Sequence, residues 1–257
     1  MSLTPDFRAR VLGRQWLTGT FLNLGSSITV EIAGRAGFDW VLVDHEHGFA
    51  GEDTLVHQLQ ALSAATAVPI VRIRVNEASL FKRALDLGAR GVMVPYVSTP
   101  EEAAAAARAV HYPPHGVRGV ARFHRGSDYG VSFDAYYRAA HDAIVLMTQI
   151  ETREGVENAE AIASVDGVDV LFVGPTDLTY NLGIPDQFDH PDFLEAARRV
   201  AQAAQRAGKA AGVLVHQPPL VERMRDLGFT VVALGSDGGA VAAGLRQFAA
   251  ALKAYGR

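Results

Sequence analysis

The sequence predicts an α/β fold, a TIM (β/α)8 barrel, in which residues 1–257 form a single domain. Short apolar runs alternate along the whole chain with Ala-rich amphipathic stretches, and this alternation gives eight strand–helix units. One boundary recurs, in which a helix ends, a glycine forms the left-handed cap and an apolar strand begins, as in AGRAGFDWVLVD, LDLGARGVMVP and MRDLGFTVVAL. The length of 257 residues suits one α/β barrel, and no linker or low-complexity tract divides it.

The expected strands are short apolar runs, at 18–21, 40–43, 70–73, 91–94, 144–149, 170–173, 212–215 and 231–234. The expected helices have apolar residues at helical spacing, at 28–36, 53–66, 78–87, 100–110, 154–163, 192–207, 219–227 and 239–254. Eight units in this order favour a closed barrel over an open doubly wound sheet. One long irregular segment is expected at 111–141, and a loop of that length in a compact domain is more often functional than idle.

The composition is that of a chain with one large core, and it excludes several classes of protein. Hydrophobic residues make up 49% and charged residues 20% of the chain, so disorder is not expected. The formal net charge of −4 argues against a nucleic-acid partner. Because cysteine is absent, disulfides and thiolate metal sites are excluded, which suits a reducing cytosol. The N-terminal segment lacks the apolar core of a signal peptide, and no apolar stretch approaches the roughly 18 residues of a membrane span, so we expect a cytoplasmic protein without membrane contact.

Two carboxylates, Glu151 and Asp177, each follow an apolar run that is expected to be a buried strand. Their separation, 177 − 151 = 26 residues, is about one βα unit, with an expected helix between them. Because strand–helix–strand connections put both strand ends on one edge of the sheet, these carboxylates should meet where barrels keep their chemistry. A divalent cation is the usual reason to hold two carboxylates together, and the alternative is a pair of helix N-terminal acids favoured by the macrodipole.

A turn dense in titratable groups follows the second expected strand, in VLVDHEHGF. It contains Asp44, His45, Glu46 and His47. A histidine next to a carboxylate suits proton transfer, because the acid orients the imidazole and supports its charged form. The alternatives are a simple polar turn and a second metal cluster.

Alternation along the third strand sends Arg72 and Arg74 to the same side, with Ile73 opposite. An arginine that points into a barrel mouth needs an anion, and a substrate carboxylate or enolate oxygen fits its fork. An ion pair with Asp44 or Glu46 is a compatible alternative.

Two glycine-containing turns follow the sixth and eighth expected strands. In VGPTDL, Gly174 allows close approach of the backbone, Pro175 presets the turn, and the amides near Thr176 open toward an anion at a helix start. In ALGSDGGAV, the alternatives are a phosphate site and a helix start capped by Ser236 or Asp237, of which the capped helix is favoured.

The placement of lysine excludes one mechanism. Lys82, Lys209 and Lys253 lie in expected helices or in a helix-to-strand turn, away from the strand C-terminal ends. A Schiff base therefore has no nucleophile at these ends, and carbonyl activation is left to a metal and an arginine. The histidines expected to be surface or packing residues are His57, His111, His141 and His190.

Taken together, VDHEHG, VRIR, LDLGARGVMVPYV, YPPHGVRGV, QIETREGVEN and FVGPTDL resemble the motifs of the HpcH/HpaI family of class II pyruvate aldolases, over nearly the whole chain. The resemblance implies reversible aldol cleavage of 4-hydroxy-2-oxo acids to an aldehyde and pyruvate, or a related 2-oxo acid such as hydroxypyruvate. It also implies a swapped C-terminal helix and a homohexamer built as a trimer of dimers. The Ala-rich stretch 239–254 is compatible with such a swap.

The resemblance further implies a role for each site residue. Glu151 and Asp177 are the metal-binding carboxylates for Mg²⁺, Mn²⁺ or Co²⁺. His47, supported by Asp44, is the acid–base residue and acts through a metal-bound water, while Arg72 steadies the pyruvate oxygens. The residues that hold the carboxylate end of the substrate are Gln149, Gly174, Pro175 and Thr176.

The chain departs from the family pattern in the loop ARFHRGSDYG, where a small Ser/Ala-rich loop is expected. Its Arg122, His124 and Arg125 are therefore expected to bear on aldehyde specificity, and His45 is a further residue that the pattern does not require. Two other functions stay open. One is a lyase for a coenzyme A thioester or a citrate-like acid, which needs a basic cleft, and the other is a non-catalytic metabolite-binding barrel.

Overall fold

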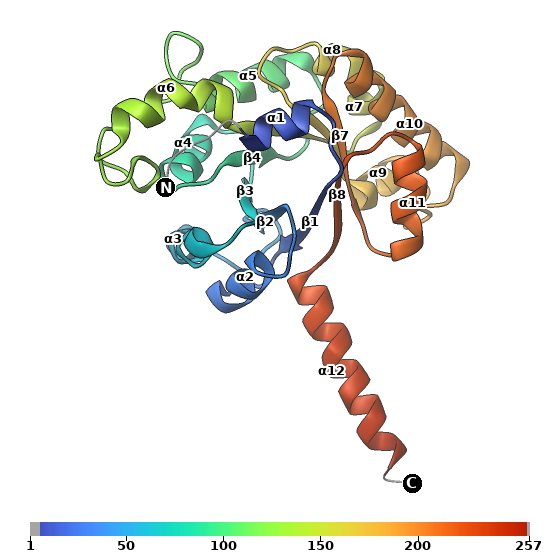
Figure 1. Cartoon of the computed structure of the whole chain (residues 1–257). Helices are drawn as coiled ribbons and strands as arrows, with labels where there is room; N and C mark the ends of the chain where they lie inside the picture. The colour runs from blue at the N-terminus through green and yellow to red at the C-terminus, as the bar shows by residue number, and fades with distance from the viewer. Residues whose placement is uncertain (1–5, 256–257) are drawn as a thin grey trace.

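The computed structural model describes residues 6–255, in which eight parallel strands close into one barrel (Figure 1). Each strand pairs with the next along the chain, and β8 closes the ring by pairing with β1. The strands are β1 (Leu17–Leu22), β2 (Trp40–Asp44), β3 (Val68–Arg72), β4 (Gly91–Val94), β5 (Val145–Ile150), β6 (Val170–Val173), β7 (Ala210–Val215) and β8 (Val231–Ser236). The predicted TIM barrel is confirmed, and all eight expected strands are present.

Alternate residues of the strands form two apolar layers, as the two-residue period requires. Trp40 and Phe172 belong to the cluster inside the barrel, where their rings pack edge to face at a centroid distance of 6.2 Å. The next residues along β2, Val41 and Val43, belong to the larger cluster between the strands and the helices. Gly19 of β1 makes room for the indole, because a Cβ there would collide with the Trp40 ring. Apolar side chains thus fill the barrel interior, so the polar groups that perform chemistry are expected at the C-terminal ends of the strands.

The helices that surround the barrel are α2 (Ser27–Gly34), α3 (Glu52–Ala61), α4 (Ala78–Asp86), α5 (Pro100–Val110), α6 (Phe133–Ala143), α7 (Arg153–Glu157), α8 (Ala159–Ala163), α9 (Pro175–Asn181), α10 (Pro191–Arg206) and α11 (Pro218–Asp226). The best-capped start is that of α5, where Thr99 and Glu102 form a capping box and Pro100 occupies the first turn. The helix expected at 154–163 is divided at Asn158 into α7 and α8.

Three helices correct the sequence-based expectations. α6 lies within the segment expected to be irregular at 111–141, and it buries Phe133, Tyr136 and Ala140 at helical spacing. α9 follows β6 directly; a helix start was expected at this turn, but no helix range was assigned after it. α1 (Asp6–Leu12) precedes the barrel; its Phe7 and Val11 join the interior cluster, so this helix plugs the N-terminal end of the barrel.

α12 (Asp237–Ala254) differs from all the other helices because it projects away from the barrel (Figure 1). None of its residues is buried, and its exposed apolar side chains are Val241, Leu245, Phe248 and Leu252. Where it leaves the barrel, a mostly apolar groove of about 720 Å³ runs beside α2 and includes Ile32 and Phe38. No helix in the described part of the chain is long and apolar enough to span a membrane.

Candidate active site

A cavity of about 320 Å³ opens at the C-terminal ends of the strands. Residues from β1, β2, β3, β5, β6, β7 and β8 or from the turns after them line it. The sequence-predicted site residues among them are Asp44, His47, Arg72, Gln149, Gly174, Pro175, Thr176 and Asp177. Glu151 lies against this wall, 1% exposed and hydrogen-bonded to Gln149. The structure therefore brings all the predicted residues to one site.

Asp44 and Arg72 form a buried pair at the ends of two neighbouring strands. The register of β2 on β3 places these residues opposite each other. Arg72 donates from Nε to Asp44 Oδ1 at 3.0 Å and from Nη2 to Oδ2 at 2.7 Å, which is the two-pronged geometry that suits a guanidinium and a carboxylate. Burial opposes ionisation of the acid, but the hydrogen bonds and charge of Arg72 lower the pKa of Asp44. Asp44 is therefore a fixed anion that orients the guanidinium.

The remaining edge of Arg72 faces the cavity wall. Nη1 lies 2.9 Å from Glu46 Oε2 as an ion pair and 3.4 Å from Gln149 Oε1 as a long hydrogen bond. The guanidinium carbon also lies 5.2 Å from the centre of the Phe21 ring. The ion-pair interpretation of Arg72 is thus correct, and its position in the cavity leaves it able to contact a bound oxygen anion.

His47 is an exposed member of the site, with its side chain 62% accessible. Its imidazole Nε2 lies 3.8 Å from Glu46 Oε2, whereas Asp44 accepts the backbone N–H of His47 at 3.3 Å. The carboxylate beside the ring is therefore that of Glu46, and Asp44 supports His47 through the backbone. Burial raises the pKa of Glu46. The charges of Arg72 and His47 oppose this shift, and those of Asp44 and Asp177 add to it.

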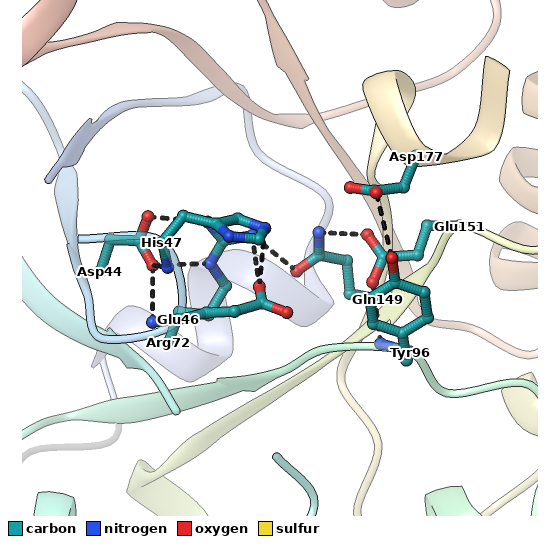
Figure 2. Close-up of polar contacts among 8 residues, drawn as sticks. All are labelled: Asp44, Glu46, His47, Arg72, Tyr96, Gln149, Glu151 and Asp177. Carbon is teal, nitrogen blue, oxygen red and sulfur yellow. Dashed lines mark hydrogen bonds and ion pairs between the residues drawn. The ribbon is translucent and has the colours of Figure 1, made fainter. Parts of the chain in front are cut away.

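Glu151 is held at both carboxylate oxygens (Figure 2). Oε1 accepts the backbone N–H of Tyr96 at 2.8 Å, and Oε2 accepts Gln149 Nε2 at 2.5 Å. Gly174 is required beside it, because a Cβ there would collide with Glu151 Oε2. Burial raises the pKa of Glu151 to about 8; the Tyr96 N–H opposes this shift, while the carboxylates of Asp177 and Glu46 add to it.

Asp177 lies in the first turn of α9 and accepts the Tyr96 hydroxyl at Oδ1, 3.0 Å away. Gln149 stands between the Asp44–Arg72 pair and the Glu151–Asp177 pair, and Figure 2 shows the contacts as one line across the site. The backbone amides of Thr176 and Asp177 also belong to the first turn of α9, where intrahelical acceptors are missing.

The carboxylates of Glu151 and Asp177 could bind a divalent cation as two protein ligands, with the remaining coordination positions open. Hard cations prefer carboxylate oxygens and retain positions for substrate and water. In the described part of the chain no three His, Asp or Glu side chains are grouped for metal binding, so the protein would supply only Glu151 and Asp177. The glycine at 174 leaves space at Glu151 Oε2. Burial raises the pKa of Glu151 most, and the carboxylates of Asp177 and Glu46 add to this shift; a bound cation would offset the charge of these carboxylates.

Two neighbouring residues lie elsewhere than predicted, and a third lies as predicted. Arg74 follows the end of β3, so alternation no longer governs it, and it pairs with Glu52 at the surface at 3.0 Å. His45 turns outward, where its Nε2 lies 3.1 Å from Gln58 of α3. Ser236 caps α12 by accepting the Gly239 N–H, as the favoured alternative for that turn predicted.

The loop that contains Arg122, His124 and Arg125 lies at the end of its own barrel that is opposite the cavity. It follows α5, and Arg125 donates to Leu87 O at 2.7 Å and Ser63 Oγ at 2.6 Å, both in segments that lead into strands. His124 packs against Tyr136, and Arg122 pairs with an aspartate of α6 at 3.1 Å. The prediction that this loop affects aldehyde specificity is therefore wrong for the active site of the same chain.

Sequence reasoning missed two further residues of the site, Tyr96 and His216. Each follows a strand, β4 and β7 respectively, so the strand-end rule that found Glu151 could have found them. Tyr96 contacts both carboxylates, and His216 lines the cavity. They were overlooked because neither lies beside another titratable group in the sequence.

Comparisons with known proteins agree with this geometry. A family model described as HpcH/HpaI aldolase/citrate lyase matches residues 17–243. The chain is 39% identical over 247 residues to a 5-keto-4-deoxy-D-glucarate aldolase of Salmonella paratyphi C, covering 96% of both chains.

Two solved structures extend the agreement to three dimensions. An HpcH/HpaI aldolase/citrate lyase family protein of Burkholderia cenocepacia J2315 superposes with a TM-score of 0.92 at 35% identity, covering 97% of this chain and all of that one. An HpcH/HpaI aldolase of Desulfitobacterium hafniense DCB-2 gives a TM-score of 0.87 at 29% identity, with 96% of both chains covered.

Proposed function

Since this chain belongs to the HpcH/HpaI aldolase/citrate lyase family and is a carbon–carbon lyase of the aldolase type, we propose that it cleaves 4-hydroxy-2-oxo acids reversibly to pyruvate and an aldehyde with a divalent cation. The observation that carries the proposal is the unbroken set of contacts from Asp44 through Arg72 and Gln149 to Glu151. In this set the guanidinium of Arg72, held by Asp44, lies near the two carboxylates that we propose as metal ligands. The guanidinium and a bound metal both stabilise negative charge on an oxygen.

The proposed substrate is a small sugar-derived oxo acid. The curated relative acts, by its name, on 5-keto-4-deoxy-D-glucarate, whose carboxylates and hydroxyls need a polar site. A cavity of about 320 Å³ with Arg72, His47 and His216 in its wall suits such a molecule. Hydroxypyruvate is a second candidate for the 2-oxo acid, because it differs from pyruvate by one hydroxyl group.

Glu151 and Asp177 would hold the cation, and Mg²⁺, Mn²⁺ and Co²⁺ are the candidates. When bound, it supplies Lewis acidity that polarises the 2-oxo group. Arg72 binds the same end of the substrate and stabilises the enolate oxygen, with Asp44 fixing its orientation. Gln149 and the first-turn amides near Pro175 and Thr176 hold the carboxylate.

His47 moves the proton. In the direction of synthesis, its neutral imidazole accepts a methyl proton of pyruvate through a water, and the electron pair of that C–H bond forms the enolate. The enolate carbon then attacks the aldehyde carbonyl, a C–C bond forms, and the protonated imidazole returns the proton to the new alkoxide. The exposure of His47 and the Glu46 carboxylate 3.8 Å from its ring support this role, because water and substrate can reach the imidazole.

The test of the proposal is cleavage and synthesis by the protein before and after removal of metal. We expect pyruvate release from a 4-hydroxy-2-oxo diacid to stop after chelation and to return with Mg²⁺, Mn²⁺ or Co²⁺. A panel of aldehydes offered with pyruvate and with hydroxypyruvate then defines specificity. Full turnover by the metal-free protein would contradict the proposal.

We also propose that residues 1–257 form one domain that acts in the cytoplasm as a homohexamer, a trimer of dimers with α12 exchanged between partners. The support is that no residue of α12 is buried in one chain, together with the apolar groove beside α2. A helix with this much exposed apolar surface is stabilised mainly by packing against another element. No nucleic acid or membrane has a part in this proposal.

A further inference from the structure

One residue outside the predicted set contacts both candidate metal ligands with two different groups. Tyr96 donates its backbone N–H to Glu151 Oε1 at 2.8 Å and its hydroxyl to Asp177 Oδ1 at 3.0 Å (Figure 2). Glu151 follows β5 and Asp177 follows β6, while Tyr96 follows β4, so a third strand end connects the other two. Within residues 6–255, the Tyr96 hydroxyl is the one hydrogen-bond donor to the Asp177 side chain.

The backbone of Tyr96 is held in an uncommon conformation. Its φ of 53° lies in the left-handed region, which is unfavourable for a bulky side chain. The next residue, Val97, donates its N–H to Gln149 O at 3.0 Å, so the chain is fixed on both sides of the strained bond. Such strain persists where surrounding contacts over-determine it, and it is concentrated at functional sites.

Packing alone does not account for the tyrosine. The residue is 51% exposed, so the ring contributes little to the core. Its distinctive group is the hydroxyl, whose partner is Asp177. The two bonds occupy one oxygen of each carboxylate and so set the orientation of both acids.

We propose that Tyr96 is a positioning residue for the carboxylate pair, whose hydroxyl holds Asp177 in the orientation that binds the cation. This inference rests on the proposed metal site at Glu151 and Asp177. It adds a claim about affinity, because a residue that orients a ligand changes cation binding more than the chemical step. Loss of a hydrogen bond to a metal-binding side chain typically weakens metal affinity about 10- to 100-fold.

The test compares Tyr96→Phe with Tyr180→Phe. Tyr180 is a matched control because it is 57% exposed and its hydroxyl also donates to an aspartate, Asp186, at 3.3 Å. Free Mn²⁺ is measured by electron paramagnetic resonance during titration of each metal-free protein. We expect Y96F to raise the Mn²⁺ dissociation constant about tenfold and Y180F to leave it unchanged.

Measurements of turnover and of thermal unfolding distinguish a role in positioning the metal ligands from a role in the chemical step or in stability. At saturating Mn²⁺, Y96F should recover the wild-type kcat within about twofold, and the metal-free variants should unfold at the same temperature as the wild type. An unchanged Mn²⁺ dissociation constant in Y96F would overturn the inference, as would a loss of kcat at saturating metal. Failure of the wild-type protein to bind Mn²⁺, or tight binding by Glu151→Gln, would instead overturn the proposed metal site itself.

Discussion

Arg72 is the residue on which the contacts of the site converge. It forms two hydrogen bonds with Asp44, an ion pair with Glu46 and a long hydrogen bond to Gln149, with only 7% of its side chain exposed. A lysine would keep the charge but lose the planar fork, so the exchange is not conservative here.

We therefore predict that Arg72→Lys lowers kcat/KM for aldol cleavage by about a hundredfold, the usual effect of removing one donor to an oxyanion. The free energy of unfolding should fall by about 2 kcal/mol, because a charged hydrogen bond to buried Asp44 is lost. Steady-state kinetics and urea unfolding measure the two effects. Arg74→Lys is the control, since Arg74 pairs with Glu52 at the surface; equal activity of the two variants would contradict the role of Arg72.

His47 yields a second prediction at the residue scale. His47→Asn removes the proton acceptor and should slow proton exchange at the pyruvate methyl group by about 10²- to 10⁴-fold, with Mn²⁺ affinity unchanged. His57→Asn serves as the control, because His57 is an exposed residue of α3 whose ring contacts Gln60. Exchange at the wild-type rate in H47N would show that another group moves the proton.

Strand ends explain how much of the site could be predicted from sequence. The strand periodicity placed Asp44, Arg72, Glu151 and Asp177 at one rim, because parallel strands end on one edge. It could not show that the ring of His47 lies beside Glu46, since the conformation of the turn after β2 decides that. Arg74 was misplaced because alternation stops where β3 stops, at Arg72.

At the scale of elements, the pattern located every strand but not every helix. The irregular appearance of 111–141 concealed α6, whose buried face combines aromatic residues with alanines. The loop before it follows a helix, so it lies at the N-terminal ends of the strands and away from the chemistry of its own chain. Topology, which sequence composition does not report, decides that placement.

His111, which ends α5, packs against His141 of α6 and yields a prediction for the pH dependence of stability. Its ring is buried without a hydrogen-bond partner in the described structure, 4.6 Å from the ring of His141. Burial lowers the pKa of His111 to about 4, and the charges of His141, Arg8, His115 and Arg118 act in the same direction.

Because the folded-state pKa lies below the ordinary 6.5, the unfolded chain binds more protons between these values, and stability falls as pH falls through this window. We predict a loss of about 2 kcal/mol from this residue between pH 7.5 and pH 5. His111→Phe keeps a ring but cannot bind a proton, so its unfolding free energy should depend less on pH. Urea unfolding at both pH values tests this; identical pH dependence of the two proteins would contradict it.

At the scale of the whole molecule, α12 is the helix that has no buried residue within a single chain. Its apolar residues Leu245 and Phe248 are 62% and 66% exposed, although the rest of the chain has a continuous core. The sequence predicted the helix correctly, because helical spacing is a local property. It could not show where the helix packs, since its proposed partner surface belongs to another copy.

The variant L245S/F248S should therefore reduce the mass of the assembly measured by light scattering after gel filtration. Gln247→Ser, on the same helix, is the control and should retain the wild-type mass. The barrel itself should stay folded in both variants, because the substituted residues are not part of its core. An unchanged mass in the double variant would contradict exchange of α12.

The most direct measurement of the central claim is proton exchange at the pyruvate methyl group in deuterated water, followed by nuclear magnetic resonance after removal of the cation. It requires enolate formation but no aldehyde, so it is independent of specificity. We predict rapid loss of the methyl signal with Mg²⁺, Mn²⁺ or Co²⁺ present, and none in the metal-free protein or in Glu151→Gln. Exchange at the full rate without metal, or its absence with all three cations, would contradict the account.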